Sequence, residues 1–284
     1  MGVLPSGVTG DDIRAALRSL GLSGQVLCVH SSLRSFGRVA GGAEAVLDAL
    51  LAQGCTVLVP SFTNDFEVPP PPGPRPARNA WDYDRFAGPT TGIGRVYTPE
   101  SREIEAGLGA IPTAVVARAG RSRGDHPLNS FAALGPLAAW LVGEQQPRRV
   151  YAPLERLAEE GGWIVLMGVG LTSMTFLHLA EQRAGRRLFV RWANDAAGQP
   201  LAAKIGSCSS GFDALMPFLA PLARSIRVGQ SEWLAFPARE TLAAAVAAIR
   251  ADPALTHCAD PRCERCNDAV AGGPIEGVAS WPEG

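Results

Sequence analysis

A strand–helix–strand succession near the N-terminus constrains the fold of this chain more than any other feature. Two apolar segments, residues 25–30 (QVLCVH) and 55–63 (CTVLVPSFT), flank a segment with helical periodicity, residues 43–54 (AEAVLDALLAQG). Strands joined in this way pair in parallel through a right-handed crossover. Together with the apolar strand expected at 163–170 (WIVLMGVG), the pattern predicts an α/β fold whose central sheet is mostly parallel and flanked by helices.

The remaining segments predict one α/β domain over residues 1–284, with residues 186–270 as a C-terminal hairpin and helix subregion. Thr9, followed by acidic residues, predicts the start of a helix that ends at Gly21. The proline-rich segment 65–89 predicts a long irregular loop, whose aromatic residues favour packing against the domain. Other expected elements are helices at 153–161, 211–223 and 239–252, a strand at 113–120, a loop leading into a helix at 126–143, and an antiparallel hairpin at 186–208.

Composition and charge exclude several classes of protein. The 284 residues carry a formal net charge of −1, which argues against a nucleic-acid partner, since such proteins are usually strongly basic. No apolar run approaches the roughly 18 to 20 residues of a membrane span, and the N-terminus lacks the features of a signal peptide. We therefore expect a cytoplasmic protein without membrane contact. In that compartment the six cysteines are not expected to form disulfides.

Three segments are expected at the carboxyl ends of neighbouring strands, where open α/β sheets bind ligands. They are residues 30–42 (HSSLRSFGRVAGG), 60–65 (PSFTND) and 168–181 (GVGLTSMTFLHLAE). Gly41 and Gly42 stand at a helix start, where free N–H groups suit a phosphate. Neither a G-x-G-x-x-G motif nor a Walker loop is present, so an ordinary strand-to-helix turn remains the alternative.

His178 and Glu181 are three residues apart on an expected helix, so both side chains lie on one face. An imidazole exchanges protons near neutral pH, and Glu181 or Asp65 could orient it or bind a cationic substrate. A semi-buried structural histidine is the alternative, and no second pair completes a metal site. His126 is expected to anchor a loop, and the role of His30 stays open. The absence of G-x-S-x-G argues against an α/β-hydrolase triad.

Five segments together resemble the aminoglycoside 3-N-acetyltransferases. They occur in the order of that family and cover roughly residues 10–185: VHSSLRSFGRVAGGAEAVLDALL, TVLVPSFT, TGIGRV, HPLNSFAALG and WIVLMGVGLTSMTFLHLAE. The resemblance implies an acetyl-CoA-dependent transferase with an α/β fold distinct from the GNAT acetyltransferases. It implies a substrate from the aminoglycoside antibiotics, acetylated on the 3-amino group, and hence a role in antibiotic resistance.

The same resemblance implies roles for individual residues. It makes His178 the general base of a direct transfer and places Glu181 and Asp65 on the acidic side of the site. It implies that acetyl-CoA is bound by His30, Ser31, Ser32, Leu33, Arg34, Phe36, Gly37, Val39, Gly41, Gly42, Ser130 and Phe131. Backbone amides or hydroxyls of residues 30–33 are candidate donors to the oxyanion.

Lys204 and Gly206 depart from the family pattern, since some members carry acidic residues there. This departure concerns the acceptor and not the donor. Transfer to a different amine in a biosynthetic pathway, and a non-catalytic zinc-containing relative, remain the two alternatives. No motif specifies an oligomeric state, and a homodimer stays open.

The remaining cysteines suggest a metal site. Residues 257–266 (HCADPRCERC) contain Cys263 and Cys266 in a C-x-x-C pair, with Cys258 upstream. Such pairs are common in structural zinc sites, and Cys208 could supply a fourth thiolate. We predict one tetrahedral zinc bound by Cys208, Cys258, Cys263 and Cys266, with His257 as the rival of Cys258. Reduced surface thiols are the alternative. The site is expected to be structural and to lie apart from His178.

Overall fold

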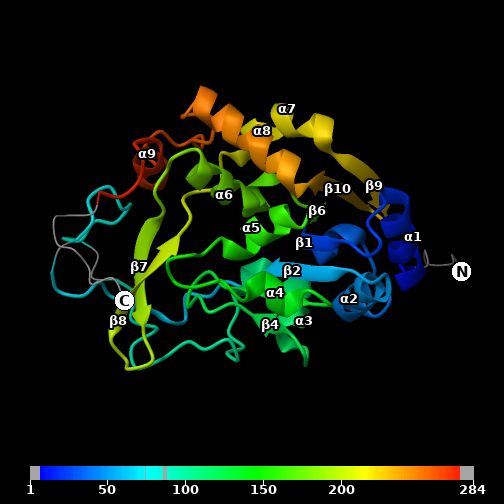
Figure 1. Cartoon of the computed structure of the whole chain (residues 1–284), viewed down its shortest axis with the longest axis horizontal. Coiled ribbons are helices and arrows are strands. Elements are labelled where there is room, and N and C mark those ends of the chain that lie inside the picture. Colours follow the sequence, from blue (N-terminus) through cyan, green and yellow to red (C-terminus); the bar gives the residue numbers. More distant parts are fainter. Residues whose placement is uncertain (1–6, 74, 86–87, 276–284) are drawn as a thin grey trace, which may run out of the picture.

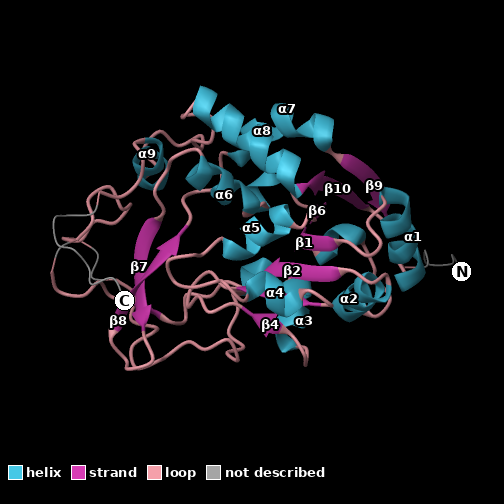
Figure 2. Ribbon diagram, viewed as in Figure 1, coloured by secondary structure: helices cyan, strands magenta, loops and turns pink. Residues whose placement is uncertain are grey.

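A seven-stranded sheet forms the centre of the computed structural model, which describes residues 7–73, 75–85 and 88–275 (Figures 1 and 2). In sheet order its strands are β4 (Ser122–Arg123), β5 (Phe131–Leu134), β2 (Thr56–Pro60), β1 (Val26–Ser31), β6 (Trp163–Met167), β10 (Ser231–Pro237) and β9 (Arg224–Val228). Strand β1 pairs in parallel with β2 and β6, and all other neighbours in this sheet are antiparallel. It follows that β4, β2, β1, β6 and β9 point one way and β5 and β10 the other. The predicted α/β fold with a mostly parallel sheet is confirmed.

Helices cover both faces of this sheet, because its central strands are apolar on both sides. In β1, Leu27 and Val29 pack into one hydrophobic core, while Val26 and Cys28 pack into another. The first core is covered by α1 (Gly10–Leu20), α2 (Gly42–Ala52) and α3 (Ala110–Ala117). The second is covered by α4 (Ala138–Val142), α5 (Ala152–Glu159), α6 (Phe176–Arg183), α7 (Met216–Leu219) and α8 (Ala238–Ala251).

The first helix begins and ends as its sequence predicts. The Thr9 hydroxyl accepts a hydrogen bond from the N–H of Asp12, and the Asp12 carboxylate accepts one from the N–H of Thr9. Gly21 ends the helix in the left-handed conformation, at φ +71°, which glycine adopts at little cost. Both ends therefore satisfy backbone groups that a helix cannot pair internally.

A second, three-stranded antiparallel sheet lies beside the main one. It contains β3 (Glu67–Val68), β7 (Phe189–Asn194) and β8 (Pro200–Ile205), and β7 and β8 form the predicted hairpin. The short helix α9 (Glu264–Val270) lies next to this sheet in Figure 1. The rings of Trp81 and Tyr83 contact Trp192 of β7, so the proline-rich loop packs against the hairpin as predicted, although Phe86 lies outside the described residues.

Three expectations about secondary structure were wrong. Residues 113–120 belong largely to helix α3 instead of a strand, and residues 131–134, expected in a loop, form β5. A short apolar run does not distinguish a buried strand from a buried helix, and α3 is buried against the sheet beside α2. Strands β9 and β10 were missed entirely. They return to the central sheet beside β6, so part of the segment 186–270 contributes strands to that sheet.

In the described part of the chain, no helix combines the length and apolar character that crossing a membrane requires.

Candidate functional site

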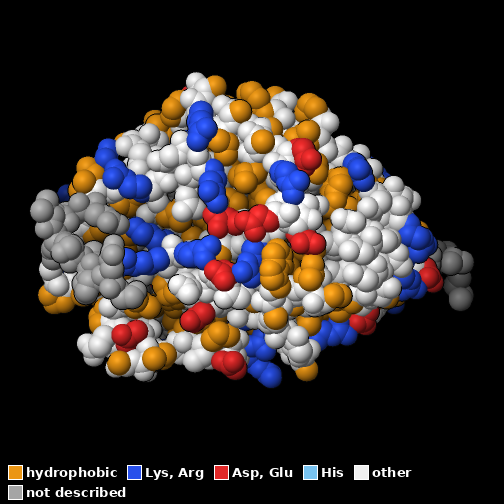
Figure 3. Space-filling view, in the orientation of Figure 1, with side chains coloured by type: hydrophobic (Ala, Val, Ile, Leu, Met, Phe, Trp, Pro, Cys, Tyr) orange, Lys and Arg blue, Asp and Glu red, His pale blue; other side chains and the backbone are white. Residues whose placement is uncertain are grey.

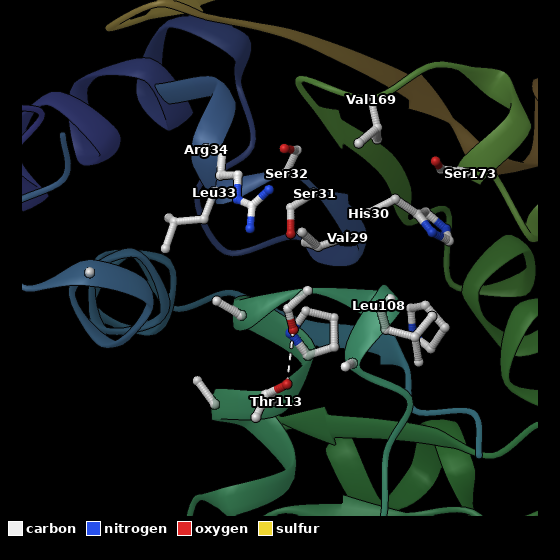
Figure 4. A pocket seen from close by; sticks show the side chains of 18 of the residues that line it. Val29, His30, Ser31, Ser32, Leu33, Arg34, Leu108, Thr113, Val169 and Ser173 are labelled. Atoms are coloured by element: carbon white, nitrogen blue, oxygen red, sulfur yellow. Dashed lines mark hydrogen bonds between the residues drawn. The ribbon is translucent and has the colours of Figure 1, made fainter. Parts of the chain in front are cut away.

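Two adjoining cavities open at the end of the sheet where β1 and β6 terminate. The larger, a groove of about 1280 Å³, lies between the segment after β1 and the segment leading into α3 (Figure 4). The smaller, of about 720 Å³, lies between α6 and the second sheet. Thr172 and Thr175, from the turn between β6 and α6, line both. A ligand in one cavity can therefore reach a ligand in the other at these two threonines.

The groove is lined by most of the residues that the resemblance assigned to acetyl-CoA: His30, Ser31, Ser32, Leu33, Arg34, Gly37, Val39 and Gly42. Figure 4 shows Ser31 and Arg34 on one side and Leu108 and Thr113 on the other. Among the described residues, the buried Ser31 Oγ finds no hydrogen-bond partner. A buried hydroxyl without a partner is costly, and Ser31 lines the groove, so this hydroxyl is a candidate donor to a bound ligand.

Four residues assigned to the same cofactor do not line the groove. Phe36 is buried in the core, where its ring packs edge-to-face with Trp233, with 5.6 Å between the ring centroids. Gly41 precedes α2 but is not part of the groove wall. Ser130 and Phe131 are fully buried in and beside β5, where the Ser130 hydroxyl bonds Ser61. The resemblance assigned Ser130 and Phe131 to the cofactor wall, whereas both side chains are packed in the interior here.

His178 lines the smaller cavity and is held by Glu181 from behind. Its Nδ1 lies 2.8 Å from Glu181 Oε2. Its ring stacks on Tyr151, 6.3 Å between centroids, and meets the edge of Phe212 at 4.7 Å. Because the ionised carboxylate only accepts hydrogen bonds, Nδ1 donates. The basic lone pair is then on Nε2, for which the described residues supply no hydrogen-bond partner.

Glu181 is itself almost completely buried, at 3% exposure, yet both its oxygens are satisfied. Ser207 Oγ donates to Oε2 at 2.8 Å, Thr256 Oγ1 donates to Oε1 at 2.9 Å, and Arg186 forms an ion pair with Oε1. Burial alone would raise the pKa of Glu181, but the hydrogen bonds and charges of His178, Arg186 and Ser207 outweigh it and lower the pKa. Glu181 therefore orients His178 and is not exposed to substrate.

The charged side chains of the cavity wall were not anticipated from the sequence. Glu67, Glu105, Arg191 and Arg265 line the cavity, whereas Asp65 lines neither cavity. Asp65 is half exposed, and its carboxylate lies 4.0 Å from Arg95. The four wall residues come from β3, a 3₁₀ turn, β7 and α9, so no sequence motif joins them.

Arg191 and Glu67 perturb each other within this wall. Burial lowers the pKa of Arg191 to about 10, although the carboxylate of Glu67, 3.8 Å away, opposes the shift. Burial likewise raises the pKa of Glu67, opposed by Arg191. The Arg191 guanidinium also lies 4.5 Å from the centre of the Trp81 ring. The cavity therefore presents charges of both signs, as does the protein face in Figure 3, where acidic and basic side chains are intermixed.

The two other buried histidines have different surroundings. His126 is fully buried, its Nδ1 accepts the N–H of Asn129 at 2.8 Å, and its Nε2 lies 2.9 Å from the carbonyl oxygen of Lys204. It anchors its loop to the hairpin, as expected. His30 lines the groove, and the Cys28 thiol is the one hydrogen-bond partner that the described residues give its Nε2, at 3.7 Å. Burial lowers the pKa of each to about 4, so both imidazoles are neutral at pH 7.

The four predicted cysteine ligands come together. The sulfur atoms of Cys208, Cys258, Cys263 and Cys266 all lie within 4.8 Å of one another. His257 is turned aside, with its Nδ1 at the carbonyl oxygen of Cys258 and its Nε2 at Asn267. A chain neighbour links this cluster to the catalytic pair, because Cys208 directly follows Ser207, whose hydroxyl donates to Glu181.

Comparison with known proteins gives consistent matches. The family model described as aminoglycoside 3-N-acetyltransferase matches residues 28–250. Aminoglycoside N(3)-acetyltransferase IX of Micromonospora chalcea is 36% identical over 188 residues, or 63% of this chain and 64% of the relative. The corresponding enzyme VIII of Streptomyces fradiae is 33% identical over 59% of this chain and 58% of the relative. The matched region thus spans about three fifths of the length of these curated relatives.

Solved structures share the fold over more of the chain. The apoenzyme of aminoglycoside acetyltransferase AAC(3)-IVa superposes with a TM-score of 0.76 at 23% identity, covering 95% of this chain and all of that one. AAC(3)-Xa gives a TM-score of 0.69 at 28% identity, covering 86% and 93%. YokD of Bacillus subtilis superposes with a TM-score of 0.69 at 26% sequence identity, covering 86% of this chain and all of that one.

Proposed function

The chain belongs to the aminoglycoside 3-N-acetyltransferase family, and from this premise we propose that it transfers an acetyl group from acetyl-CoA to the 3-amino group of an aminoglycoside. The single observation that carries the proposal is the meeting of two cavities at Thr172 and Thr175, with His178 in the wall of one of them. Such an arrangement suits a direct transfer between two bound substrates, with no acylated protein residue as intermediate.

The larger groove suits the donor. Its wall is mostly apolar, with Leu33, Val39 and Leu108, which matches the pantetheine arm of acetyl-CoA. Arg34 and the start of α2 at Gly42 offer positive charge and free N–H groups toward its phosphates. AAC-IIIb, which shares this fold with a TM-score of 0.69 at 23% identity, has been solved as a binary complex with CoASH.

The smaller cavity suits the acceptor and supplies the base. An aminoglycoside amine is mostly protonated at neutral pH and must lose a proton before or during attack on the thioester. Nε2 of His178 takes that proton, while Glu181 fixes the tautomer and stabilises the imidazolium that forms. The thioester carbonyl oxygen gains negative charge in the tetrahedral intermediate. The unpartnered hydroxyl of Ser31 is the donor that we assign to this oxyanion.

Thiol release measured with DTNB tests the reaction. Purified protein, acetyl-CoA and a panel of aminoglycosides should give turnover with at least one member, and mass spectrometry should find one added acetyl group on the 3-amino nitrogen. No turnover with any aminoglycoside would refute the acceptor, and no binding of CoA would refute the transferase itself.

A different amine is the second candidate acceptor, favoured by one observation. Arg191 and Arg265 line the acceptor cavity together with Glu67 and Glu105, so the wall is not uniformly acidic. A polycation gains less from such a wall than from carboxylates alone. Turnover with monoamines that carry an anionic group, but not with aminoglycosides, would select this candidate.

We also propose that the four-cysteine cluster, Cys208, Cys258, Cys263 and Cys266, binds one zinc ion. Tetrahedral zinc with Zn–S bonds of about 2.3 Å requires sulfur atoms about 3.8 Å apart, which small movements of atoms within 4.8 Å of one another can reach. With four thiolates the coordination is complete, so the ion crosslinks chain segments and takes no part in the reaction.

Metal analysis checks this site. Protein purified without added zinc should contain about one equivalent, and Cys263→Ser should lower zinc content and melting temperature together. Cys55→Ser, which alters a buried thiol outside the cluster, is the matched control for zinc content. Metal-free protein with four rapidly reacting thiols would refute the proposal.

A further inference from the structure

We propose that the four-cysteine cluster positions the His178–Glu181 pair, so that the metal it binds controls the catalytic geometry and not only the stability. This inference rests on the proposed function, in which His178 is the base. It is carried by the chain segments that bring the cysteines together, because the same segments hold both oxygens of Glu181.

The first segment is 206–208. Ser207 Oγ donates to Glu181 Oε2, the oxygen that also accepts from His178 Nδ1, and the next residue is Cys208. Gly206 lies directly against the imidazole, since a methyl group there would be 2.9 Å from His178 Cγ. A shift of Cys208 therefore moves two groups that touch the catalytic pair.

The second segment is 256–258. Thr256 Oγ1 donates to Glu181 Oε1 and accepts from Arg186 Nη1 at 2.7 Å, two residues before Cys258. Thr256 is buried, at 2% exposure, so its hydroxyl has no solvent alternative. Gly211, three residues after Cys208, packs closely against this second segment. A side chain at Gly211 would overlap the carbonyl oxygen of Thr256.

The third segment is the start of α9, which carries Cys263 and Cys266. The N–H of Cys258 donates to Cys266 Sγ at 3.4 Å, which ties α9 to the second segment. Arg265, between the two cysteines, donates to the carbonyl oxygen of Gly206 at 3.1 Å and lines the acceptor cavity. One metal ion bound by the four thiolates thus fixes three segments that all reach the site.

If His178 and Glu181 are held less firmly, the rate of proton transfer falls more than the affinity for CoA. Proton transfer requires Nε2 of His178 to be held at hydrogen-bond distance from the amine, and a misplacement of about 1 Å can cost about 10²-fold in rate. The donor groove is formed by β1, α2 and α3, none of which carries a cluster cysteine. Loss of the metal should therefore lower kcat and leave the binding of CoA almost unchanged.

Removal and return of zinc test the inference on the full chain. After chelation, protein that remains folded by circular dichroism should lose about 10²-fold in kcat, with a less than twofold change in the Kd for CoA. One equivalent of zinc should restore kcat. Long-range ¹⁵N spectra of the imidazoles, with His178→Gln assigning the signal, should show the Nδ1–H tautomer in the zinc form and a tautomer mixture in the zinc-free form.

Variants decide the matter if the zinc-free protein does not stay folded. Thr256→Val should retain one zinc, lower kcat and disturb the His178 tautomer, and Thr256→Ser should restore both. Thr241→Val is the control, since Thr241 is equally buried and its hydroxyl has no partner among the described residues. Its kcat and imidazole spectrum should match the parent.

Two results would overturn the inference. One is a folded, zinc-free protein with unchanged kcat and an unchanged His178 spectrum. The other is a Thr256→Val variant with the parent spectrum. If no acceptor is turned over, the proposed function has failed, and the imidazole spectra alone still decide whether the cluster positions His178.

Discussion

The groove at the end of β1 and the cavity beside α6 are built in opposite ways. One continuous stretch, residues 29–42, supplies much of the groove wall, and its side chains are mostly apolar or hydroxylic. The cavity draws its wall from nine separate stretches of the chain between Phe62 and Arg265, and that wall includes charges of both signs. A contiguous wall suits a co-substrate with a fixed shape, whereas a dispersed wall lets each segment alter acceptor preference separately.

Each wall contains one buried histidine, and the two histidines differ in their polar partners. His30 in the groove has a single polar partner among the residues that the structure describes, the Cys28 thiol, and burial lowers the pKa of His30 to about 4. His178 in the cavity faces a carboxylate that is held by a serine, a threonine and an arginine. Two imidazoles of similar burial thus differ in their surroundings, because in the described part of the chain only His178 has a carboxylate that fixes its orientation and tautomer.

The largest expected effect is a difference in kcat between variants of His178 and His30. His178→Ala should lower kcat by about 10² to 10⁴-fold, the usual range for loss of a general base, with little change in CoA binding. His30→Gln should change kcat by less than tenfold, since its imidazole is not prepared to accept a proton. Steady-state kinetics and calorimetry with CoA measure both variants. Equal losses of kcat in the two would show that the contrast has no catalytic meaning.

The next effect concerns acid stability and belongs to His30. The folded-state pKa, about 4, is below the ordinary 6.5, so the unfolded chain binds more protons in between. The contribution of His30 is therefore fully present above pH 6.5 and is lost as the pH falls toward 4. Between pH 7.5 and 5 this loss is about 2 kcal/mol.

Urea unfolding at the two pH values checks this sign. The drop in unfolding free energy should be smaller by about 2 kcal/mol in His30→Gln than in the parent. A drop of the same size in both would mean that His30 titrates normally in the folded protein.

The smallest effects compare the charges of the two walls. Glu105→Gln should raise the KM of a cationic acceptor severalfold, about 1 kcal/mol or less for a partly exposed charge, without changing that of acetyl-CoA. Arg34→Ala should do the reverse, because Arg34 lines the groove. Both effects should shrink at high salt. If both variants raised the same KM, the assignment of donor and acceptor to the two cavities would be wrong.

The variant Asp65→Asn tests whether Asp65 contributes to binding of the acceptor. The sequence assigned Asp65 to the acidic wall, whereas its half-exposed carboxylate faces Arg95 and lines neither cavity. We expect a smaller rise in acceptor KM than for Glu105→Gln, measured under the same conditions. A larger rise would return Asp65 to the acceptor site.

The sequence alone determined the features that depend on neighbours along the chain. Helical and strand periodicity predicted the βαβ unit, and the i, i+3 spacing predicted that His178 and Glu181 meet, which they do at 2.8 Å. The resemblance placed the segment 30–42 at the donor site, and eight residues of this segment line the groove, where strand end, turn and helix start are consecutive. The C-x-x-C pair with two further cysteines predicted the four-sulfur cluster.

Only the tertiary structure decided which distant residues share a wall. Strands β9 and β10 could be placed only through pairing with β6, and burial in the interior decided that the apolar segment 110–117 is a helix. Glu105, Arg191 and Arg265 are joined by no spacing, so their charges were missed. The burial of Ser130 and Phe131 away from the groove was likewise visible only in the tertiary structure. The contacts that link the cysteine segments to Glu181 also arise only from tertiary packing. Ser207 and Thr256 are 49 positions apart, and packing of the loops around Gly211 alone brings both hydroxyls onto one carboxylate.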